Sequence, residues 1–285
     1  MTRIGIIARG DRPDARSVVR ELVQWLQARG CRVVGDRETA GLLPEGTTAV
    51  DRAALPAEVD LIVVLGGDGT LLSVARLVDG LDVPILGVNL GGLGFLTATT
   101  LEALFPTLDA VLRGDYTAED RMVLAATHSR GGEALADYLA LNDVVIAKGA
   151  LGRLVDLEVS VDGQMVTAYR ADGLIIATPT GSTAYNLSAA GPILFPTMDA
   201  IVLTPICSHA LTNRPIVLPG TVELEVGLLT DTPDVALSLD GQAGLALTAK
   251  DVIRVRRAGA RIRLIRDPQK TYFQVLRTKL KWGER

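Results

Sequence analysis

The six residues 65–70, Leu-Gly-Gly-Asp-Gly-Thr, constrain the fold of this chain more than any other stretch. They follow an apolar run, residues 61–64, and precede a segment that can form a helix, so glycines and a carboxylate fall where a buried strand ends. Open α/β sheets bind ligands at that end of their strands. Glycines there let the backbone approach a phosphate closely, with amide N–H groups turned outward as donors. Because Asp68 is a poor phosphate ligand by charge, we expect it to have another role.

Strand-like and helix-like patterns alternate through the N-terminal part of the chain. Apolar runs typical of strands occur at residues 4–8, 31–34, 61–64 and 84–88. The last run leads into a second glycine-rich turn, residues 87–96. The alternation predicts an α/β domain over residues 1–118, with a mostly parallel sheet and helices on its faces. We expect the two glycine turns to lie side by side at one edge of that sheet.

From about residue 119 the pattern changes to short β-type runs punctuated by Gly, Pro and Asp. Regular runs of this kind with few helices predict a β-rich, sandwich-like domain over residues 119–268. Residues 269–285 read as a terminal helix with Phe273, Leu276 and Leu280 on one face. We expect this helix to pack back on the first domain.

The composition is that of a globular protein. The chain has 285 residues, enough for two ordinary domains with a core each. Hydrophobic residues make up 48% and charged residues 22% of it. A formal net charge of −4 argues against a protein that binds nucleic acid or an anionic membrane. Any phosphate that it binds must therefore be met by local groups.

The cysteine pattern and the apolar runs indicate a cytoplasmic location. Cys31 and Cys207 show no metal-ligand spacing, and both are predicted to be free core thiols in a reducing compartment. The N-terminal apolar run is too short for a signal peptide, and no run approaches the roughly 18 to 20 residues of a membrane helix. The sequence thus predicts no zinc site and no membrane partner.

A second polar loop follows an apolar strand in the β-rich part, at residues 179–185. It packs hydroxyls, a glycine and an aromatic ring into seven residues, which can offer donors to a nucleotide and a ring to its base. The alternative is a Ser/Thr-rich turn that caps a helix. Likewise Asn142 and Asp143 can be ordinary turn residues, and His209 can be an acid, a base, a ligand or none of these. The P-loop, dinucleotide-fingerprint, GxSxG and HExxH motifs are missing from the sequence.

In order along nearly the whole chain, these motifs resemble those of the NAD kinases, which use ATP or polyphosphate. The resemblance rests on the two glycine turns, on Leu-Asn-Asp at 141–143, on residues 172–185, on Thr-Pro-Ile at 204–206 and on Ser-Leu-Asp-Gly-Gln at 238–242. It implies an α/β domain and a β-rich, NAD-binding domain. It also implies transfer of the terminal phosphoryl group of ATP to the 2′-hydroxyl of the adenosine ribose of NAD, which gives NADP.

The resemblance assigns a role to each site residue. Asp68 would be the catalytic acid-base residue, and Leu72 and Phe95 would form apolar walls for the adenine. Asn142 and Asp143 would hydrogen-bond the adenosine; many relatives have Glu where this chain has Asp143. The phosphate-binding residues would be Gly66, Gly67, Gly69 and Thr70. The remaining substrate-binding residues, some of them reaching across a subunit interface, would be Arg153, Arg170, Asp172, Thr180, Thr183, Ala184, Tyr185, Asn186, Leu187, Ser188 and Gln242, and Gly69 would share this role.

Cofactors and partners follow from the same resemblance. Magnesium or another divalent cation would enter with ATP, and the sequence shows no cluster of carboxylates that would hold it by itself. NAD and ATP would be the substrates of a homo-oligomer, a dimer or tetramer with sites near subunit interfaces. Two alternatives stay open: a lipid kinase of the diacylglycerol-kinase type, which shares the GGDGT turn, and a non-catalytic NAD sensor.

Overall fold

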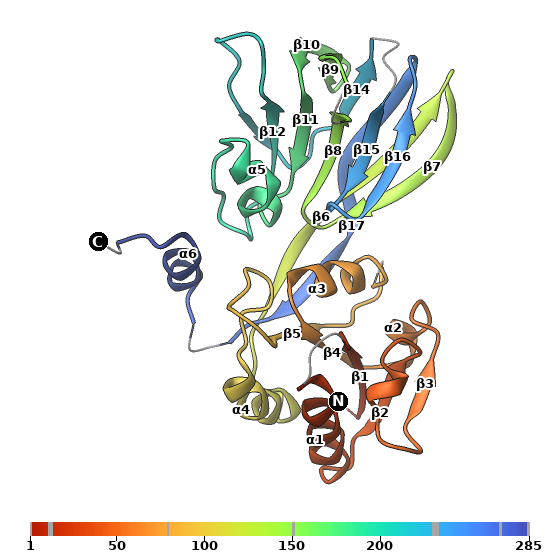
Figure 1. The fold of residues 1–285 in the computed structure, drawn as a ribbon, viewed down its shortest axis with the longest axis vertical. Helices are drawn as coiled ribbons and strands as arrows, with labels where there is room; N and C mark the ends of the chain where they lie inside the picture. The colour runs from red at the N-terminus through yellow and green to blue at the C-terminus, as the bar shows by residue number, and fades with distance from the viewer. Residues whose placement is uncertain are drawn as a thin grey trace. The chain divides into compact units, whose positions relative to one another are not determined.

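The computed structural model describes residues 2–10, 14–78, 80–149, 152–229, 234–267 and 270–283. The chain divides into two compact units, shown with their elements in Figure 1. The first comprises Met1–Asp120 and Ile262–Arg285, and the second comprises Arg121–Arg261. Residues 262–267, which the sequence pattern assigned to the β-rich domain, thus belong to the first unit.

The first unit contains the predicted parallel sheet. Its strand order is β5 (Ile85–Asn89), β4 (Leu61–Gly66), β1 (Arg3–Ala8), β2 (Arg32–Asp36) and β3 (Thr48–Val50). The chain moves outward from β1 through β2 and β3 and then returns to β4 on the other side of β1. The strand order therefore reverses between β1 and β4, and open α/β sheets bind ligands outside the carboxyl ends of the strands at such a point.

Helices cover this sheet. They are α1 (Ala15–Gln27), the 3-10 turn η1 (Ala40–Leu42), α2 (Leu55–Glu58), α3 (Asp68–Ala75) and α4 (Leu101–Leu112). The buried face of α1 carries Val19, Leu22 and Leu26, which pack into one core with the strands. All six residues of β4 are buried, as its uninterrupted apolar sequence predicts for a central strand.

The terminal helix α6 (Tyr272–Leu280) belongs to the first unit. It begins with a capping box in which Thr271 and Gln274 bond each other's backbone N–H groups. Leu276 of the predicted apolar face is buried together with Val275, whereas Phe273 of that face is 61% exposed. The prediction was therefore correct for Leu276 and wrong for Phe273, because the helix is rotated toward Val275. Residues 269, 284 and 285 of the predicted helix lie outside the described residues.

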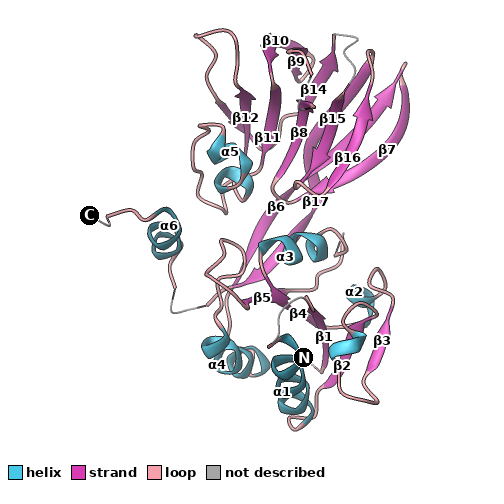
Figure 2. Ribbon diagram, viewed as in Figure 1, coloured by secondary structure: helices cyan, strands magenta, loops and turns pink. Residues whose placement is uncertain are grey.

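The second unit is a sandwich of antiparallel sheets, drawn as magenta strands in Figure 2. One sheet has β10 (Gln164–Ala171), β9 (Val155–Val161), β14 (Leu224–Leu228) and β17 (Asp251–Ile265), with β6 (Ala118–Arg130) and β7 (Glu133–Ala140) alongside. The first residues of β6, up to Asp120, and the last residues of β17, from Ile262, belong to the first unit. The other has the order β13 (Ile216–Pro219), β12 (Ala200–Ile206), β11 (Gly173–Ala177), β8 (Asp143–Lys148), β15 (Val235–Leu239) and β16 (Ala243–Leu247). Residues of both sheets share one core, which confirms the predicted fold class.

The two cysteines lie in different environments. Cys31 is buried, as predicted, but Cys207 is exposed, so its prediction as a core thiol was wrong. Cys207 directly follows β12 and has a φ of 46°, which places it in a turn beyond the end of the strand. Among the described residues, no helix is long and apolar enough to cross a membrane.

Candidate functional site

Asp68 connects the two glycine turns of the first unit. It is the first residue of α3, and its carboxylate points at the backbone of the second turn. Oδ2 accepts a hydrogen bond from the Phe95 N–H at 2.8 Å. Oδ1 accepts from the N–H groups of Leu96 at 3.1 Å and Thr97 at 3.0 Å, and from the Thr97 hydroxyl at 2.8 Å. The turns thus lie side by side, as predicted.

These bonds leave one acceptor position on Asp68. An ionised carboxylate offers about four lone-pair sites on its two oxygens. Oδ1 is already used by three donors, whereas Oδ2 accepts only the bond from Phe95 in the described contacts. Since the side chain is half-buried rather than enclosed, Oδ2 can accept one further hydroxyl. The backbone of the second turn therefore fixes the orientation of a carboxylate that can still take a proton.

Close packing explains two of the glycines. A Cβ atom on Gly94 would collide with Oδ1 of Asp68 and with the Thr97 hydroxyl. A Cβ atom on Gly66 would lie 2.6 Å from Oγ1 of Thr70. Neither glycine has a positive φ, so the requirement is for space rather than for backbone freedom. The missing side chain of Gly94 allows the second turn to approach Asp68, and that of Gly66 leaves room for Thr70 within the first turn.

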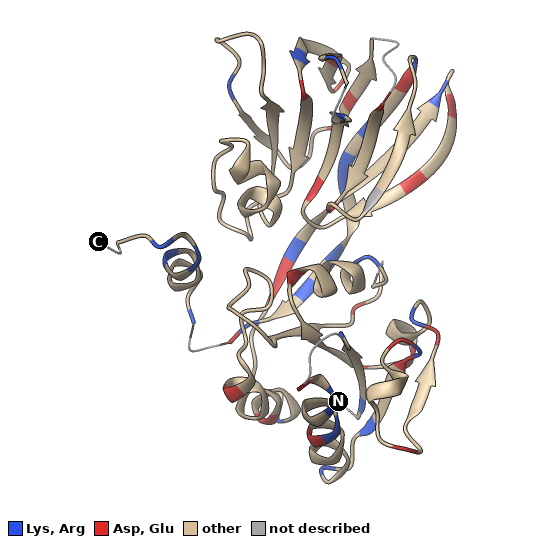
Figure 3. Cartoon of the chain, in the orientation of Figure 1, with Lys and Arg blue, Asp and Glu red and all other residues tan. Residues whose placement is uncertain are grey.

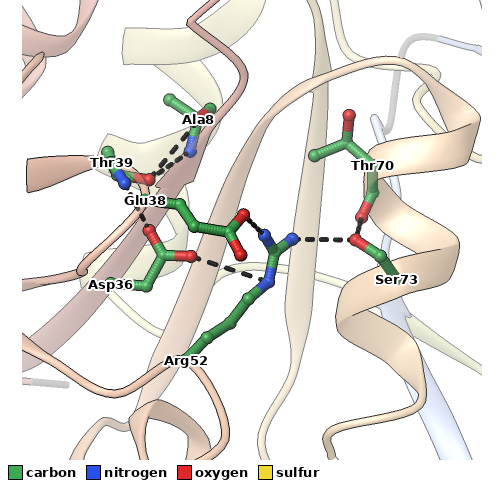
Figure 4. A network of polar contacts seen from close by, with 7 residues as sticks. All are labelled: Ala8, Asp36, Glu38, Thr39, Arg52, Thr70 and Ser73. Carbon is green, nitrogen blue, oxygen red and sulfur yellow. Dashed lines mark hydrogen bonds and ion pairs between the residues drawn. The ribbon is translucent and has the colours of Figure 1, made fainter.

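A chain of polar contacts supports α3 from the neighbouring strands (Figure 4). The Arg52 guanidinium donates to the Ser73 hydroxyl at 2.8 Å, and that hydroxyl donates to the Thr70 carbonyl at 2.7 Å. Nε of Arg52 lies 3.6 Å from Oδ2 of Asp36, the last residue of β2, and Nη1 contacts Glu38. The first turn of α3, which begins with Asp68, is thereby tied to the end of β2.

The turns border a cavity of about 360 Å³ in the first unit. Gly66, Gly67 and Asp68 line it from the first turn, and residues 89–94 line it from the second. Arg9, which follows β1, and Lys279 of α6 complete the lining. Of the predicted adenine walls, Leu72 is buried, and the Phe95 ring is half-buried and lies 5.8 Å from Nζ of Lys279. Sequence reasoning missed Arg9 and Lys279, because single basic residues outside a motif give no signal.

The second unit brings together Asn142, Asp143 and the polar loop. The Asp240 carboxylate accepts from the N–H groups of residues 141–143 at 2.7 to 3.1 Å. The Thr178 hydroxyl donates to the Leu141 carbonyl at 2.6 Å and accepts from the Gly181 N–H at 3.0 Å. A Cβ on Gly181 would collide with the backbone of Asn142. Asp240 was not among the predicted site residues, although it lies in the Ser-Leu-Asp-Gly-Gln motif.

Two causes together raise the pKa of Asp143 to about 7: burial of its carboxyl group, which is the larger, and the negative charge of the nearby Asp240. The side chain is only 3% exposed. At neutral pH, protonated and ionised forms therefore coexist, and the group can either donate to or accept from a ligand hydroxyl.

The loop residues 180–188 divide into a scaffold and an accessible part. Asn186 is fully buried: Nδ2 donates to the carbonyls of Ser182 and Pro192 at 3.0 Å, and Oδ1 accepts from the Thr204 hydroxyl at 2.6 Å. The Ser182 hydroxyl likewise donates to the Pro179 carbonyl at 2.6 Å. The Asn186 side chain, which is predicted to line the nucleotide site, thus holds the loop together through these bonds. The residues of the predicted set that reach the surface are Thr183, Ala184, Tyr185, Leu187 and Ser188, whereas Thr180 is buried with Arg121 3.4 Å from its hydroxyl.

Asp172, another predicted site residue, lies at the opposite end of the sheet that contains β8 and β11. Strands β8 and β11 are antiparallel, with Asp143 opposite Ala177 and Ala147 opposite Gly173. Asp172 therefore lies one strand length from Thr178, roughly 20 Å at about 3.4 Å per residue. Asp172 pairs with Lys148 at 3.0 Å. The exposed Arg153 and Arg170 flank this end, whereas the exposed Gln242 follows β15 at the end that holds Asp143.

A carboxylate in a glycine turn at the switch point of a parallel sheet is typical of proteins that bind phosphorylated ligands. The family models "ATP-NAD kinase N-terminal domain" and "ATP-NAD kinase C-terminal domain" match residues 4–116 and 141–267. The chain therefore belongs to the ATP-NAD kinase family, and it is a kinase that acts as a phosphotransferase.

Individual relatives agree with this family. The chain is 52% identical over 285 residues to proteins named NAD kinase from Syntrophotalea carbinolica and from Geobacter metallireducens, with both chains fully covered in each case. The solved structure of yeast NADH kinase complexed with NADH matches with a TM-score of 0.91 and 25% identity, over 100% of this chain and 89% of the other. An NAD kinase from Archaeoglobus fulgidus in complex with ATP shares the fold, with a TM-score of 0.77 and 24% identity over 98% and 99% of the two chains.

Proposed function

We propose that this protein transfers the terminal phosphoryl group of ATP to the 2′-hydroxyl of the adenosine ribose of NAD and so produces NADP. The observation that supports this most directly is the Asp68 carboxylate, held by four donors and open at Oδ2. The names of the relatives, NAD kinase, agree with the acceptor. We place the reaction in the cytoplasm, where free cysteines such as Cys31 and Cys207 stay reduced.

In this mechanism Asp68 acts on the acceptor. Oδ2 accepts the proton of the 2′-hydroxyl while the hydroxyl oxygen bonds to the terminal phosphorus, and the bond from that phosphorus to the bridging oxygen breaks to release ADP. A positioned base of this kind typically contributes about 10²- to 10⁴-fold. The glycine turns position the phosphates, which is most of what phosphoryl transfer requires of a protein.

A divalent cation would enter with ATP and supply neutralisation of the phosphate charge. Among residues 2–10, 14–78, 80–149, 152–229, 234–267 and 270–283, no three His, Cys, Asp or Glu side chains group as a metal site. A cation bound to ATP needs only one or two protein carboxylates, because phosphates and water provide its other ligands. The chain's own residues then have to hold the phosphates, and the glycine turns can do so.

We propose that NAD is bound by residues of two subunits. Asn142, Asp143 and the surface part of the 180–188 loop would contact the adenosine. Arg170 and Asp172, at the other end of β11, would reach a site of a neighbouring subunit. The length of that strand supports a homo-oligomer, because the two groups of one chain lie roughly 20 Å apart along it.

Incubation of the purified protein with magnesium, NAD and either ATP or polyphosphate tests the proposal. We expect NADP to form with ATP; failure with both donors over a range of pH would overturn the assignment. The Asp68→Asn variant should lose at least about 100-fold in kcat. It should also lose about 1 to 3 kcal/mol of stability, because an amide nitrogen would face a donor of the second turn.

Thr97→Val is the matched control for Asp68→Asn. It removes the hydroxyl donor to Oδ1 but keeps the carboxylate. If Asp68 takes the proton, Thr97→Val should retain kcat within about tenfold. Equal losses in the two variants would mean that Asp68 only shapes the turn.

A further inference from the structure

The cavity beside the glycine turns contains two cationic side chains that no motif identifies. Arg9 is the residue that follows β1. Lys279 lies in the last turn of α6, some 270 residues later in the chain. Among the described residues that line this cavity, Asp68 is the acidic one. The charges of this described lining sum to plus one, in a protein whose net charge is −4.

Printed contacts place the backbone of Arg9 and the ammonium group of Lys279 beside the glycine turns. The Arg9 N–H donates to the Leu65 carbonyl at 3.1 Å, so its backbone continues beside β4 toward the first glycine turn. Lys279 lies 5.8 Å from the centre of the Phe95 ring, within the range of a cation–π contact. Helix α6 carries Arg277 and Lys279 and no acidic residue, as the blue bands of Figure 3 show. No acidic neighbour on that helix competes for Lys279.

The size and chemistry of the cavity indicate the class of its ligand. A volume of about 360 Å³ is within the range of small-molecule sites and well above the space of a single ion. Glycine turns offer backbone N–H donors, and basic side chains add charge-assisted bonds. Two cations on separate elements, with N–H groups between them, suit an extended anion better than an isolated phosphate.

We propose that Arg9 and Lys279 bind a chain of linked phosphates in this cavity, together with the two glycine turns. This inference rests on the proposed function, because the phosphate chain is that of ATP or the diphosphate of NAD. In either case Lys279 brings the C-terminal helix into the ligand site of the first unit. Removal of its charge weakens the binding of the phosphates without removing the acid-base group.

Binding of inorganic tripolyphosphate, measured by calorimetry on the full chain without nucleotide, tests the inference apart from catalysis. We expect Lys279→Gln and Arg9→Gln each to raise the Kd about tenfold, as loss of one charge-assisted bond should. Arg277→Gln removes a positive charge from the same exposed helix outside the cavity, and we expect its Kd to match that of the wild type. Equal Kd values for the wild type and both cavity variants would overturn the inference.

Steady-state kinetics then identify the source of the phosphates. A rise in KM for ATP in Lys279→Gln, with KM for NAD unchanged, places the donor in the cavity; the reverse places the diphosphate of NAD there. Both results uphold the inference, and no change in either KM overturns it. If the wild type forms no NADP yet binds tripolyphosphate through Lys279, the proposed function fails while the phosphate site stands.

Discussion

The carboxylate of Asp68 and the missing side chain of Gly94 depend on each other. Gly94 leaves the space that Oδ1 occupies, and Oδ1 accepts from the N–H groups of Leu96 and Thr97 beyond it. We therefore predict that Gly94→Ala displaces the carboxylate and costs about 1 to 3 kcal/mol in the free energy of unfolding, the range for overpacking. It should also lower kcat by at least about tenfold, because a displacement of 1 Å can cost 10²-fold.

Gly41→Ala is the control for Gly94→Ala. Gly41 lies in the same unit, has no heavy atom within 4 Å of an added Cβ and lacks a positive φ. In urea denaturation, the free energy of unfolding of Gly41→Ala should lie within about 0.5 kcal/mol of the wild-type value. Its initial rates should equal those of the wild type. If Gly94→Ala behaved like Gly41→Ala, the close approach of Asp68 to the second turn would be wrong.

Asp143 gives the protein a pH dependence of known sign. Its pKa is 3.8 in the ordinary case and about 7 in the folded protein. The folded state therefore holds one proton more than the unfolded state between these values, and the free energy of unfolding falls as pH rises through that window. The slope reaches about 1.4 kcal/mol per pH unit. We predict that Asp143→Asn lacks this component, so that its stability relative to the wild type rises from pH 4 to 7 and is level above.

Urea denaturation of both proteins at several pH values measures this difference directly. The difference between the two curves isolates Asp143 from the other titrating groups, which both proteins share. A difference that does not change with pH would show that Asp143 ionises in the folded protein as it does in the unfolded chain.

For single residues, the sequence could locate Asp68 but not the hydrogen-bond donors that hold its carboxylate. An apolar run followed by Gly-Gly-Asp-Gly locates the carboxylate at a strand end, since periodicity and glycine chemistry are local properties. The donors at residues 95–97 are mostly backbone N–H groups, which every residue but proline has, so no side chain marks them. Asn186 shows a second difficulty: an amide suits a ligand site and a buried scaffold equally well, and its bonds to Ser182 and Pro192 cannot be read from the sequence.

At the scale of elements, Arg52 joins β2 to α3. Asp36 is fully buried, and Arg52, 23% exposed, is the cation beside it. We predict that Arg52→Met leaves the Asp36 charge poorly compensated and costs about 2 to 4 kcal/mol in the free energy of unfolding, near the value for a broken buried pair. Because Ser73 loses its donor as well, the first turn of α3 loosens and kcat falls.

Arg37→Met provides the comparison. Arg37 pairs with Asp51 at 3.3 Å, but both side chains are mostly exposed, at 73% and 67%. Exposed pairs contribute about 0 to 1 kcal/mol, so this variant should unfold almost as the wild type does and keep its activity. Denaturation midpoints and kcat, measured for both variants, test the idea; similar effects of the two would show that the Asp36 contact does not support the turn.

Elements could be predicted where one face or both faces of a strand are buried. The uninterrupted apolar run of β4 predicted a buried strand, because a strand that is buried on both faces has apolar residues at successive positions. Helix α6 was located correctly, and Leu276 of its predicted face is buried, but Phe273 is not. Its sequence has apolar residues on more than one side, and the burial of Val275 rather than Phe273 depends on tertiary contacts that periodicity does not contain.

At the scale of the whole molecule, predicted NAD-binding residues lie at both ends of β11, and one bound NAD would have to contact both groups. The loop that begins at Thr178 and the pair formed by Lys148 and Asp172 lie at opposite ends. Sequence motifs give the order of these residues but not the strand direction that separates them. If both groups serve NAD, a second subunit has to provide one of them, and a two-fold interface would then create two equal composite sites.

Co-expression of two inactive variants tests this arrangement. Asp68→Asn removes the base, and Asp172→Asn should remove a contact of the neighbouring site. In a mixed dimer isolated through two different affinity tags, one site carries both substitutions and the other carries neither, so we predict about half of the wild-type activity. A tagged pair that both carry Asp68→Asn is the control and should stay inactive. If Asp172 serves the site of its own chain, every site in the mixed dimer has one defect and no activity returns.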